Sequence, residues 1–248
     1  MSFGSDPRFR DTFNFSPTTQ RSGTLSMAFR KKGHTTLRRA RTPEDKDKVR
    51  EAFIAAGRKL FAEEEPDTVS LRRIASAAGY APAAIYQYFE DQADLFFHIR
   101  SQDMQAATEY LRRLTEGVID PEVRVKTLFV GVADYWLAHM DHFMNIFPVR
   151  IQGQPVPRIG GLTFGQSKVV QDSLALHYGV VDALFSTFTH PPLPARQAAD
   201  LLIASVYGSI AFPEMTRTME WSDLPTLIRT LVDTIVDSWV AQGVRKRK

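Results

Sequence analysis

The side chains best suited to recognition chemistry lie between residues 81 and 87, in the run APAAIYQ. The amide of Gln87 can donate and accept a hydrogen bond at once, which is how Gln pairs with the edge of adenine in the major groove of DNA. Ala83 and Ala84 are small enough to let a backbone approach base edges, and a methyl group can contact thymine. These residue types predict a surface that reads base edges.

Two short helices joined by a tight turn would position these side chains, over residues 70–89 (SLRRIASAAGYAPAAIYQYF). Gly79 is expected to end the first helix, because glycine enters the left-handed conformation without a steric penalty. A second helix would begin near Ala81 and Pro82, where proline is tolerated, and would turn Ile85 inward. This is the helix-turn-helix shape, which lays a helix in the major groove. The apolar residues of the first helix recur at helical spacing, at Leu71, Ile74, Ala75 and Ala78.

The start of the first helix offers phosphate chemistry. Ser70 is predicted to cap it, and Arg73 three residues later cannot close a capping box as Glu would. The open helix N-terminus can therefore receive a DNA phosphate. Arg72 and Arg73 add positive charge to the same turn.

The charge of the chain is concentrated near its N-terminus. Residues 1–50 hold 12 Lys or Arg and 5 Asp or Glu, against 31 and 28 in all 248 residues. We interpret residues 1–41 as a disordered basic tail that attracts phosphate without sequence selectivity, or as a solvated leader of no further role. Translation from Met27 would remove part of it. The chain has no cysteine, which excludes disulfides and thiolate metal sites and suits a cytoplasmic location.

Helical patterns fill the rest of the chain. Thr42 and Pro43 begin a helix that Glu63 to Pro66 end, and another runs from Asp91 to about Gly117. A long helix is expected over 121–147, a loop over 148–165 and further helices over 167–188, 195–218 and 223–242. The fold class is all-α, with a helix-turn-helix domain at 42–97 and a larger helical bundle at 98–248.

The run from Val49 to Ile99 resembles the N-terminal domain of TetR-type transcriptional regulators, through IA-x-x-AG followed by IY-x-YF. The resemblance implies that Tyr86 and Tyr88 contact the sugar-phosphate backbone or nearby bases. Ala81 stands where the family usually has a capping serine, and Gln92 where it usually has a lysine near phosphate. The predicted DNA-binding residues are Ser70, Arg72, Arg73, Ala81, Pro82, Ala83, Ala84, Tyr86, Gln87, Tyr88 and Gln92.

The resemblance also implies that the bundle holds a ligand cavity and a dimer interface. Aromatic side chains crowd its middle helices and suit a hydrophobic or planar ligand, although plain core packing is the alternative. The expected ligand-binding residues are Tyr110, Phe129, Trp136, His139, Met140, Phe143, His177 and Tyr178. In the last two helices, the expected dimer residues are Leu202, Ser205, Val206, Ser209, Leu231, Ile235 and Trp239, with intrachain core as the alternative.

The sequence thus predicts a ligand-responsive regulator, a repressor that binds a palindromic double-stranded DNA operator as a homodimer. A hydrophobic or aromatic small molecule would release it. Without a catalytic motif such as G-x-S-x-G or H-E-x-x-H, no enzyme activity is expected, nor any cofactor, metal or membrane partner. Two alternatives stay open: a constitutive or architectural DNA-binding dimer without effector, and a helical enzyme that carries an incidental helix-turn-helix.

Overall fold

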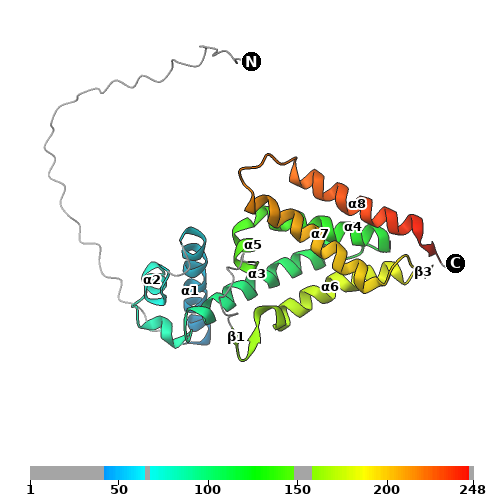
Figure 1. Ribbon diagram of the computed structural model, residues 1–248. Coiled ribbons are helices and arrows are strands. Elements are labelled where there is room, and N and C mark those ends of the chain that lie inside the picture. Colours follow the sequence, from blue (N-terminus) through cyan, green and yellow to red (C-terminus); the bar gives the residue numbers. More distant parts are fainter. Residues whose placement is uncertain (1–41, 65–67, 148–157, 246–248) are drawn as a thin grey trace, which may run out of the picture. The chain divides into compact units, whose positions relative to one another are not determined.

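The computed structural model describes residues 42–64, 68–147 and 158–245, and these are mainly helical (Figure 1). The predicted tail at 1–41 lies outside the described residues. The first helices are α1 (Pro43–Glu63), α2 (Leu71–Ala77), the 3₁₀ helix η2 (Ala84–Gln87) and α3 (Gln92–Leu114). The bundle continues with α4 (Pro121–Ala138), α5 (Met140–Ile146), η3 (Phe164–Gln166), α6 (Lys168–Phe185), α7 (Ala195–Met215) and α8 (Leu224–Gln242).

Local sequence signals begin most of these helices. The Thr42 hydroxyl accepts the N–H of Asp45 at 3.1 Å, and Pro43 follows at the first position of α1. The carboxylates of Asp91, Asp120 and Asp223 cap α3, α4 and α8 in the same way. Such caps satisfy backbone donors that the helix itself leaves unpaired. The helix starts predicted at Thr42 and Asp91 are confirmed.

Two sequence predictions about helices are corrected, and α6 begins without a side-chain cap. The second helix of the helix-turn-helix is a four-residue 3₁₀ turn that begins only at Ala84. The long helix expected over 121–147 breaks at His139, whose φ of −130° and ψ of 51° leave the helical region. Ser167 stands at the start of α6, but its hydroxyl donates to the carbonyl of Phe164 instead of capping the helix.

Two short antiparallel strand pairs are a further correction. Strand β1 (Arg158–Ile159) pairs with β2 (Leu162–Thr163), and β3 (Phe188–His190) pairs with β4 (Val244–Arg245). Gly160 and Gly161 join the first pair with φ angles of +57° and +81°. Positive φ at both central residues suits a two-residue hairpin, and glycine adopts it without strain.

The described residues form two hydrophobic cores. The first lies among α1, α2, η2 and the start of α3, with Phe53, Ile74, Ile85 and Leu95 buried at its centre. The second fills the bundle from Met104 onward. Helix α3 therefore contributes its first half to one core and its second half to the other.

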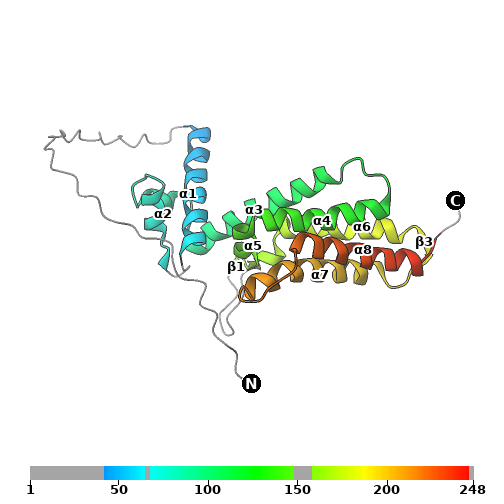
Figure 2. The ribbon, with the colours of Figure 1, turned by 90° about the horizontal axis from the view of Figure 1, so that it is seen from above.

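Helix α4 is the central element of the bundle. It contacts α3, α6, α7 and α8, and Figure 2 shows the bundle helices grouped around it. Val125, Leu128, Phe129 and Val132 of this helix are fully buried. None of the described helices combines the length and apolarity needed to cross a bilayer.

Candidate nucleic-acid interface and ligand pocket

A tight turn after α2 exposes the segment that carries the predicted base-reading residues. The N–H of Tyr80 donates to the carbonyl of Ala75 at 2.9 Å, and the N–H of Gly79 donates to that of Ser76 at 3.1 Å. These two bonds form a Schellman motif, which needs a left-handed residue, and Gly79 has a φ of +81°. Glycine therefore ends α2 as predicted.

Ile85 anchors the 3₁₀ turn, and its neighbours point outward. The Ile85 side chain is fully buried, whereas Tyr86 is 53% exposed and Gln87 and Ala83 are also exposed. Ala84 is half-buried. The buried Ile85 side chain thus anchors an exposed turn, whose outer surface carries the amide of Gln87, the phenol of Tyr86 and the methyl group of Ala83.

Tyr88 contributes to packing as well as to the surface. Its ring lies 5.5 Å from that of Phe53 in an edge-to-face arrangement, and Phe53 is buried in the first core. Burial and the neighbouring Tyr80 raise the pKa of the Tyr88 hydroxyl. Of the two tyrosines expected at DNA, Tyr86 has the more exposed side chain.

The N-terminus of α2 confirms the predicted cap at Ser70 and pairs Arg73 with groups of the chain itself. The Ser70 hydroxyl accepts the N–H of Arg73 at 3.3 Å. The Arg73 guanidinium, however, binds both carboxylate oxygens of Glu64 at 2.6 Å and the carbonyl of Thr68 at 3.1 Å. The charge of Arg73 is therefore paired with that of Glu64 at the end of α1. Arg72, which is exposed, is the other cation of this turn.

Other predicted contact residues lie at the edges of the same surface. Ala81 and Pro82 are exposed in the turn before η2. Gln92 is half-buried at the first position of α3, directly after the exposed Asp91 that caps this helix.

A buried ion pair that sequence reasoning missed links α1 to the bundle. The Arg58 guanidinium of α1 donates to Oδ1 of Asp103 on α3 at 2.7 and 3.0 Å, and Nδ1 of His142 on α5 lies 3.5 Å from the same oxygen. The Asp103 side chain is only 2% exposed. A detectable signal existed, because Asp103 continues the buried stripe of Leu95 and Ile99 at four-residue spacing.

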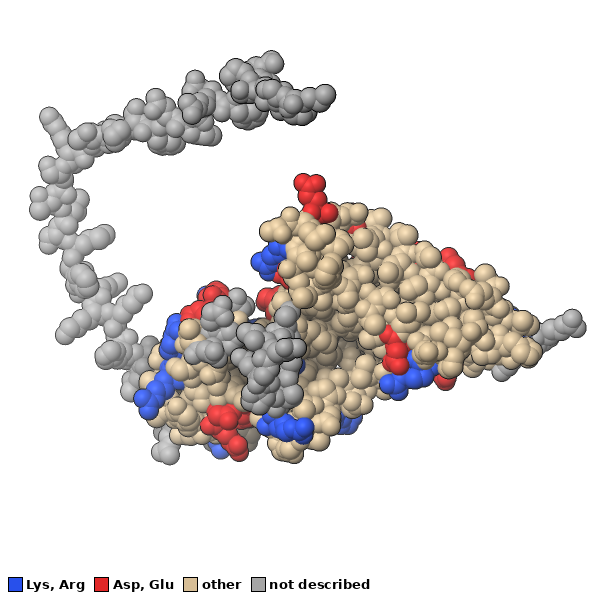
Figure 3. All heavy atoms as spheres, in the orientation of Figure 1, with Lys and Arg blue, Asp and Glu red and all other residues tan. Residues whose placement is uncertain are grey.

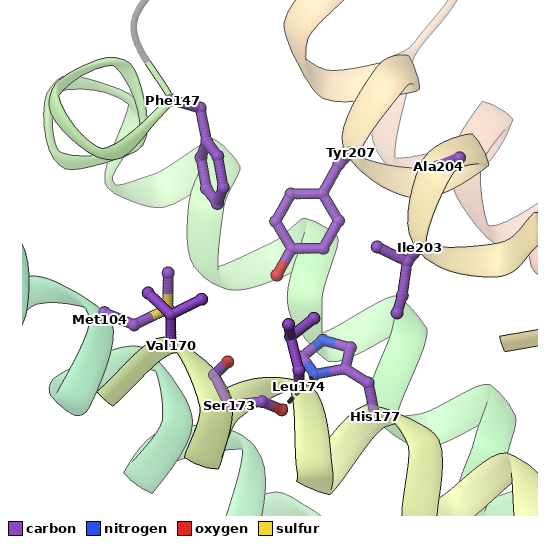
Figure 4. A pocket seen from close by; sticks show the side chains of 9 residues that line it. All are labelled: Met104, Phe147, Val170, Ser173, Leu174, His177, Ile203, Ala204 and Tyr207. Atoms are coloured by element: carbon purple, nitrogen blue, oxygen red, sulfur yellow. Dashed lines mark hydrogen bonds between the residues drawn. The ribbon is translucent and has the colours of Figure 1, made fainter. Parts of the chain in front are cut away.

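A pocket of about 200 Å³ lies between α3, α6 and α7 (Figure 4). Its walls are mostly apolar, and the polar side chains of Ser173, His177 and Tyr207 lie on α6 and α7. Ala204 and Phe147 are exposed, so the pocket reaches the surface. It is lined by Met104, Phe147, Val170, Ser173, Leu174, His177, Ile203, Ala204 and Tyr207.

Of the eight residues expected to bind a ligand, His177 is the one that lines this pocket. Phe129, Trp136 and Phe143 are buried in the adjoining core, where Phe129 packs edge-on against His177 at 5.5 Å. The remaining four lie outside the lining: Tyr110 against Tyr135, His139 stacked on Tyr135, Met140 at the edge of the core, and Tyr178 hydrogen-bonded to Asp200. Helical spacing did not distinguish Tyr207 and Ile203 as pocket-facing residues, because α7 carries apolar side chains on several of its faces.

Burial governs the titration of the pocket's polar groups. It lowers the pKa of the His177 imidazole, against a smaller opposing effect of the Ser173 carbonyl. Burial also raises the pKa of the Tyr207 hydroxyl to about 12. At neutral pH both side chains are therefore uncharged.

The structure corrects part of the predicted dimer surface. Leu202 and Val206 are fully buried within the chain, and Trp239 is 5% exposed against Phe185. Side chains without exposed area have nothing to bury against a partner. Ser205, Ser209, Leu231 and Ile235 are half-buried. The outward stripe of α7 lies one position earlier, at Leu201, Ala204, Gly208, Phe212 and Met215.

A family model described as bacterial regulatory proteins of the tetR family matches residues 53–99. This range covers the end of α1, the α2 turn, η2 and the start of α3, the elements that build the exposed surface described above. No curated protein matches the sequence.

Several solved structures share the fold. The fatty acid degradation regulator FadR of Bacillus halodurans aligns with a TM-score of 0.61 at 17% identity, over 80% of this chain and 97% of its own. The transcriptional regulator FadR of Bacillus subtilis, solved in complex with stearoyl-CoA, aligns with a TM-score of 0.62 at 16% identity, over 75% and 97%. A TetR family transcription regulator of Marinobacter aquaeolei VT8 aligns with a TM-score of 0.56 at 16% identity, over 83% and 100%.

The described part of the chain therefore has the all-helical fold of these regulators, including the bundle beyond the matched range. The recognition turn, its capping residues Ser70 and Asp91 and the turn glycine Gly79 lie within that range. The match to the tetR family model is confined to residues 53–99, and beyond that range the chain resembles these regulators in its fold.

Proposed function

We propose that this protein is a repressor that binds a palindromic operator as a homodimer and leaves it when a small apolar molecule occupies the bundle. The observation that carries the proposal is the protruding 3₁₀ turn, in which buried Ile85 holds exposed Gln87, Tyr86 and Ala83 outward. An amide aimed at a base edge gives sequence selectivity, and the phenol of Tyr86 suits the backbone.

The pocket and the Arg58–Asp103 ion pair supply a route for ligand control. Met104, which lines the pocket, follows Asp103 directly on α3. Phe147, also in the lining, follows Ile146, whose carbonyl accepts the Arg100 guanidinium at 2.6 Å. A ligand that displaces Met104 or Phe147 would shift the two contacts that join α1, α3 and α5. Among structural neighbours, the Bacillus subtilis FadR was solved in complex with stearoyl-CoA, a molecule with a long apolar chain.

The outward face of α7 and α8 supports assembly of two copies. In Figure 3 most of the surface over these helices is uncharged, with a few acidic side chains along its upper edge. Leu201, Phe212 and Met215 on α7 are each 45% exposed or more. Contiguous apolar surface of this kind usually marks an interface. A two-fold dimer would present two protruding turns to half-sites about one helical turn, ~34–36 Å, apart.

The proposal is tested by selecting genomic fragments on the purified full-length protein and footprinting those retained. We expect a palindromic site, loss of retention with Gln87→Ala combined with Tyr86→Ala, and release by some members of a panel of apolar compounds. Leu162→Ala, at an exposed residue of the β1–β2 hairpin, serves as the control and should bind like the wild type.

Retention of no specific fragment would overturn the proposal as a whole. Specific retention that no compound reverses would instead favour the constitutive dimer.

A further inference from the structure

We propose that the pocket between α3, α6 and α7 takes a small neutral molecule, largely apolar, that donates one hydrogen bond to Nε2 of His177. Substituted phenols and small N–H heterocycles are the chemical class that fits. This inference rests on the proposed function, in which the same pocket is the effector site, and it specifies the effector's chemistry.

The lining excludes a charged ligand and limits its size. No Lys, Arg, Asp or Glu is among the described residues that line the pocket. A carboxylate or phosphate placed there would lose its hydration without gaining a partner of opposite charge. An apolar cavity of about 150 Å³ accepts benzene, so the present volume of about 200 Å³ suits a substituted single ring or a fused pair.

The hydrogen bond of His177 fixes its tautomer. Its Nδ1 lies 2.7 Å from the backbone carbonyl oxygen of Ser173, one turn earlier on α6. A carbonyl oxygen can only accept, so Nδ1 carries the proton. In the neutral ring, Nε2 is then a bare lone pair that can only accept a hydrogen bond.

That lone pair has no protein partner among the described residues. His177 is 1% exposed, and Nε2 is a buried atom without a hydrogen bond. Figure 4 shows its ring edge turned away from the Ser173 carbonyl and toward the space below Tyr207. Because buried polar atoms are usually paired, an unpaired acceptor facing a pocket identifies the ligand atom that it lacks: an O–H or N–H.

Burial, which lowers the pKa of His177, keeps the imidazole in this accepting form at neutral pH. A carboxylate or an acyl thioester brings acceptor atoms only and would meet the lone pair with another lone pair. The aromatic rings of Phe147 and Tyr207, 5.2 Å apart in an edge-to-face pair, favour a flat guest. Acceptor chemistry and aromatic walls therefore point to the same class.

The test compares four probes with the full-length protein, without DNA, by calorimetry. They are 4-ethylphenol, the donor-free ethylbenzene, the anion 4-methylbenzoate, and stearoyl-CoA. We expect 4-ethylphenol to bind about 2- to 12-fold more tightly than ethylbenzene, the worth of one net hydrogen bond. The 4-methylbenzoate anion should bind more weakly than either.

A matched pair of variants locates the effect. In His177→Phe the ratio of the affinities for 4-ethylphenol and ethylbenzene should fall to about one, because the variant keeps an aromatic ring at this position but has no hydrogen-bond acceptor. His139→Phe removes an imidazole that lies outside the lining and should keep the ratio. Should His177→Phe fail to fold, long-range ¹H–¹⁵N spectra of histidine-labelled wild type supply a second readout. They should report an Nδ1–H tautomer whose Nε2 signal moves with 4-ethylphenol and not with ethylbenzene.

Equal affinities for 4-ethylphenol and ethylbenzene, binding of no neutral probe, or preferential binding of 4-methylbenzoate or stearoyl-CoA would each overturn the inference. Operator release is measured separately by gel shift. Tight, His177-dependent binding of 4-ethylphenol without release would uphold the pocket's chemistry and reject its role as effector site.

Discussion

At the residue scale, base selectivity depends on Gln87. In a Gln87→Ala variant we expect discrimination at one base pair of each half-site to fall by roughly 1–3 kcal/mol, because a bidentate amide contact is lost. Competition binding against single-base operator variants measures it. Leu162→Ala, at an exposed residue of the β1–β2 hairpin, should leave base preference unchanged. If Gln87→Ala weakened binding to all operator sequences equally, the side chain would contact the DNA backbone and would not recognise a base.

Stability at mildly acidic pH depends on His177. Burial lowers its pKa in the folded protein, so the unfolded chain takes up a proton that the folded chain refuses. The free energy of unfolding should therefore decline as the pH falls below about 6.5, the ordinary histidine value. His98, whose pKa is lowered mainly by burial, acts in the same direction. Denaturant unfolding at pH 7.5 and 5.5 should give a smaller decline for His177→Gln than for the wild type.

Exposed His190→Gln is the control for that measurement and should follow the wild-type decline. A His177→Gln variant with the full wild-type decline would contradict the assignment of this sensitivity to the pocket.

Sequence alone could separate inward from outward side chains in the recognition module, because helical spacing and the turn glycine determine them. It placed Ile74 and Ile85 in the core and Tyr86 and Gln87 outside it. It could not find the partner of Arg73, since the Glu64 carboxylate is brought near by the path of the chain between α1 and α2. Ion pairs between elements depend on tertiary geometry that no local pattern encodes.

At the element scale, the Arg58–Asp103 pair joins α1 to α3. Arg58→Met would remove the guanidinium that hydrogen-bonds the buried Asp103 carboxylate and leave it only the His142 ring, 3.5 Å away. Removing one partner of a buried ion pair typically costs about 3–5 kcal/mol. Asp103→Leu should cost less, because the Arg58 side chain is 24% exposed and its charge can turn to water. The double variant should be more stable than Arg58→Met alone. Chemical denaturation of the four proteins measures this cycle, and strict additivity of the two single effects would show that the pair is not coupled.

Caps, prolines and glycines predicted where most helices begin and end, because these signals act within a few residues. The break between α4 and α5 had no such signal. There, the His139 ring nitrogen Nδ1 bonds to the carbonyl of Tyr135 at 2.8 Å while its backbone leaves the helix. The sequence pattern also did not predict which face of α7 packs inward. The stripe that contains Leu201 and the stripe that contains Leu202 are both apolar, but only the Leu202 stripe packs into the core.

At the scale of the whole molecule, substitutions at two glycines test the proposed dimer interface. A Cβ added at Gly208 on α7 or at Gly179 on α6 would meet no atom within 4 Å other than its own helix backbone and chain neighbours. Both glycines are exposed, so a longer side chain can extend into solvent, and each substitution replaces a poor helix former with a better one. They differ in place, since Gly208 lies within the apolar outward stripe of α7.

Gly208→Arg should bring a charge into the interface and give a monomer by sedimentation equilibrium at concentrations where the wild type is a dimer. Gly179→Arg should remain a dimer. Because the two recognition turns of a dimer share one operator, Gly208→Arg should also lose most operator affinity while keeping the wild-type thermal stability of its monomer fold. A dimeric Gly208→Arg protein with wild-type operator affinity would move the interface away from this face of α7.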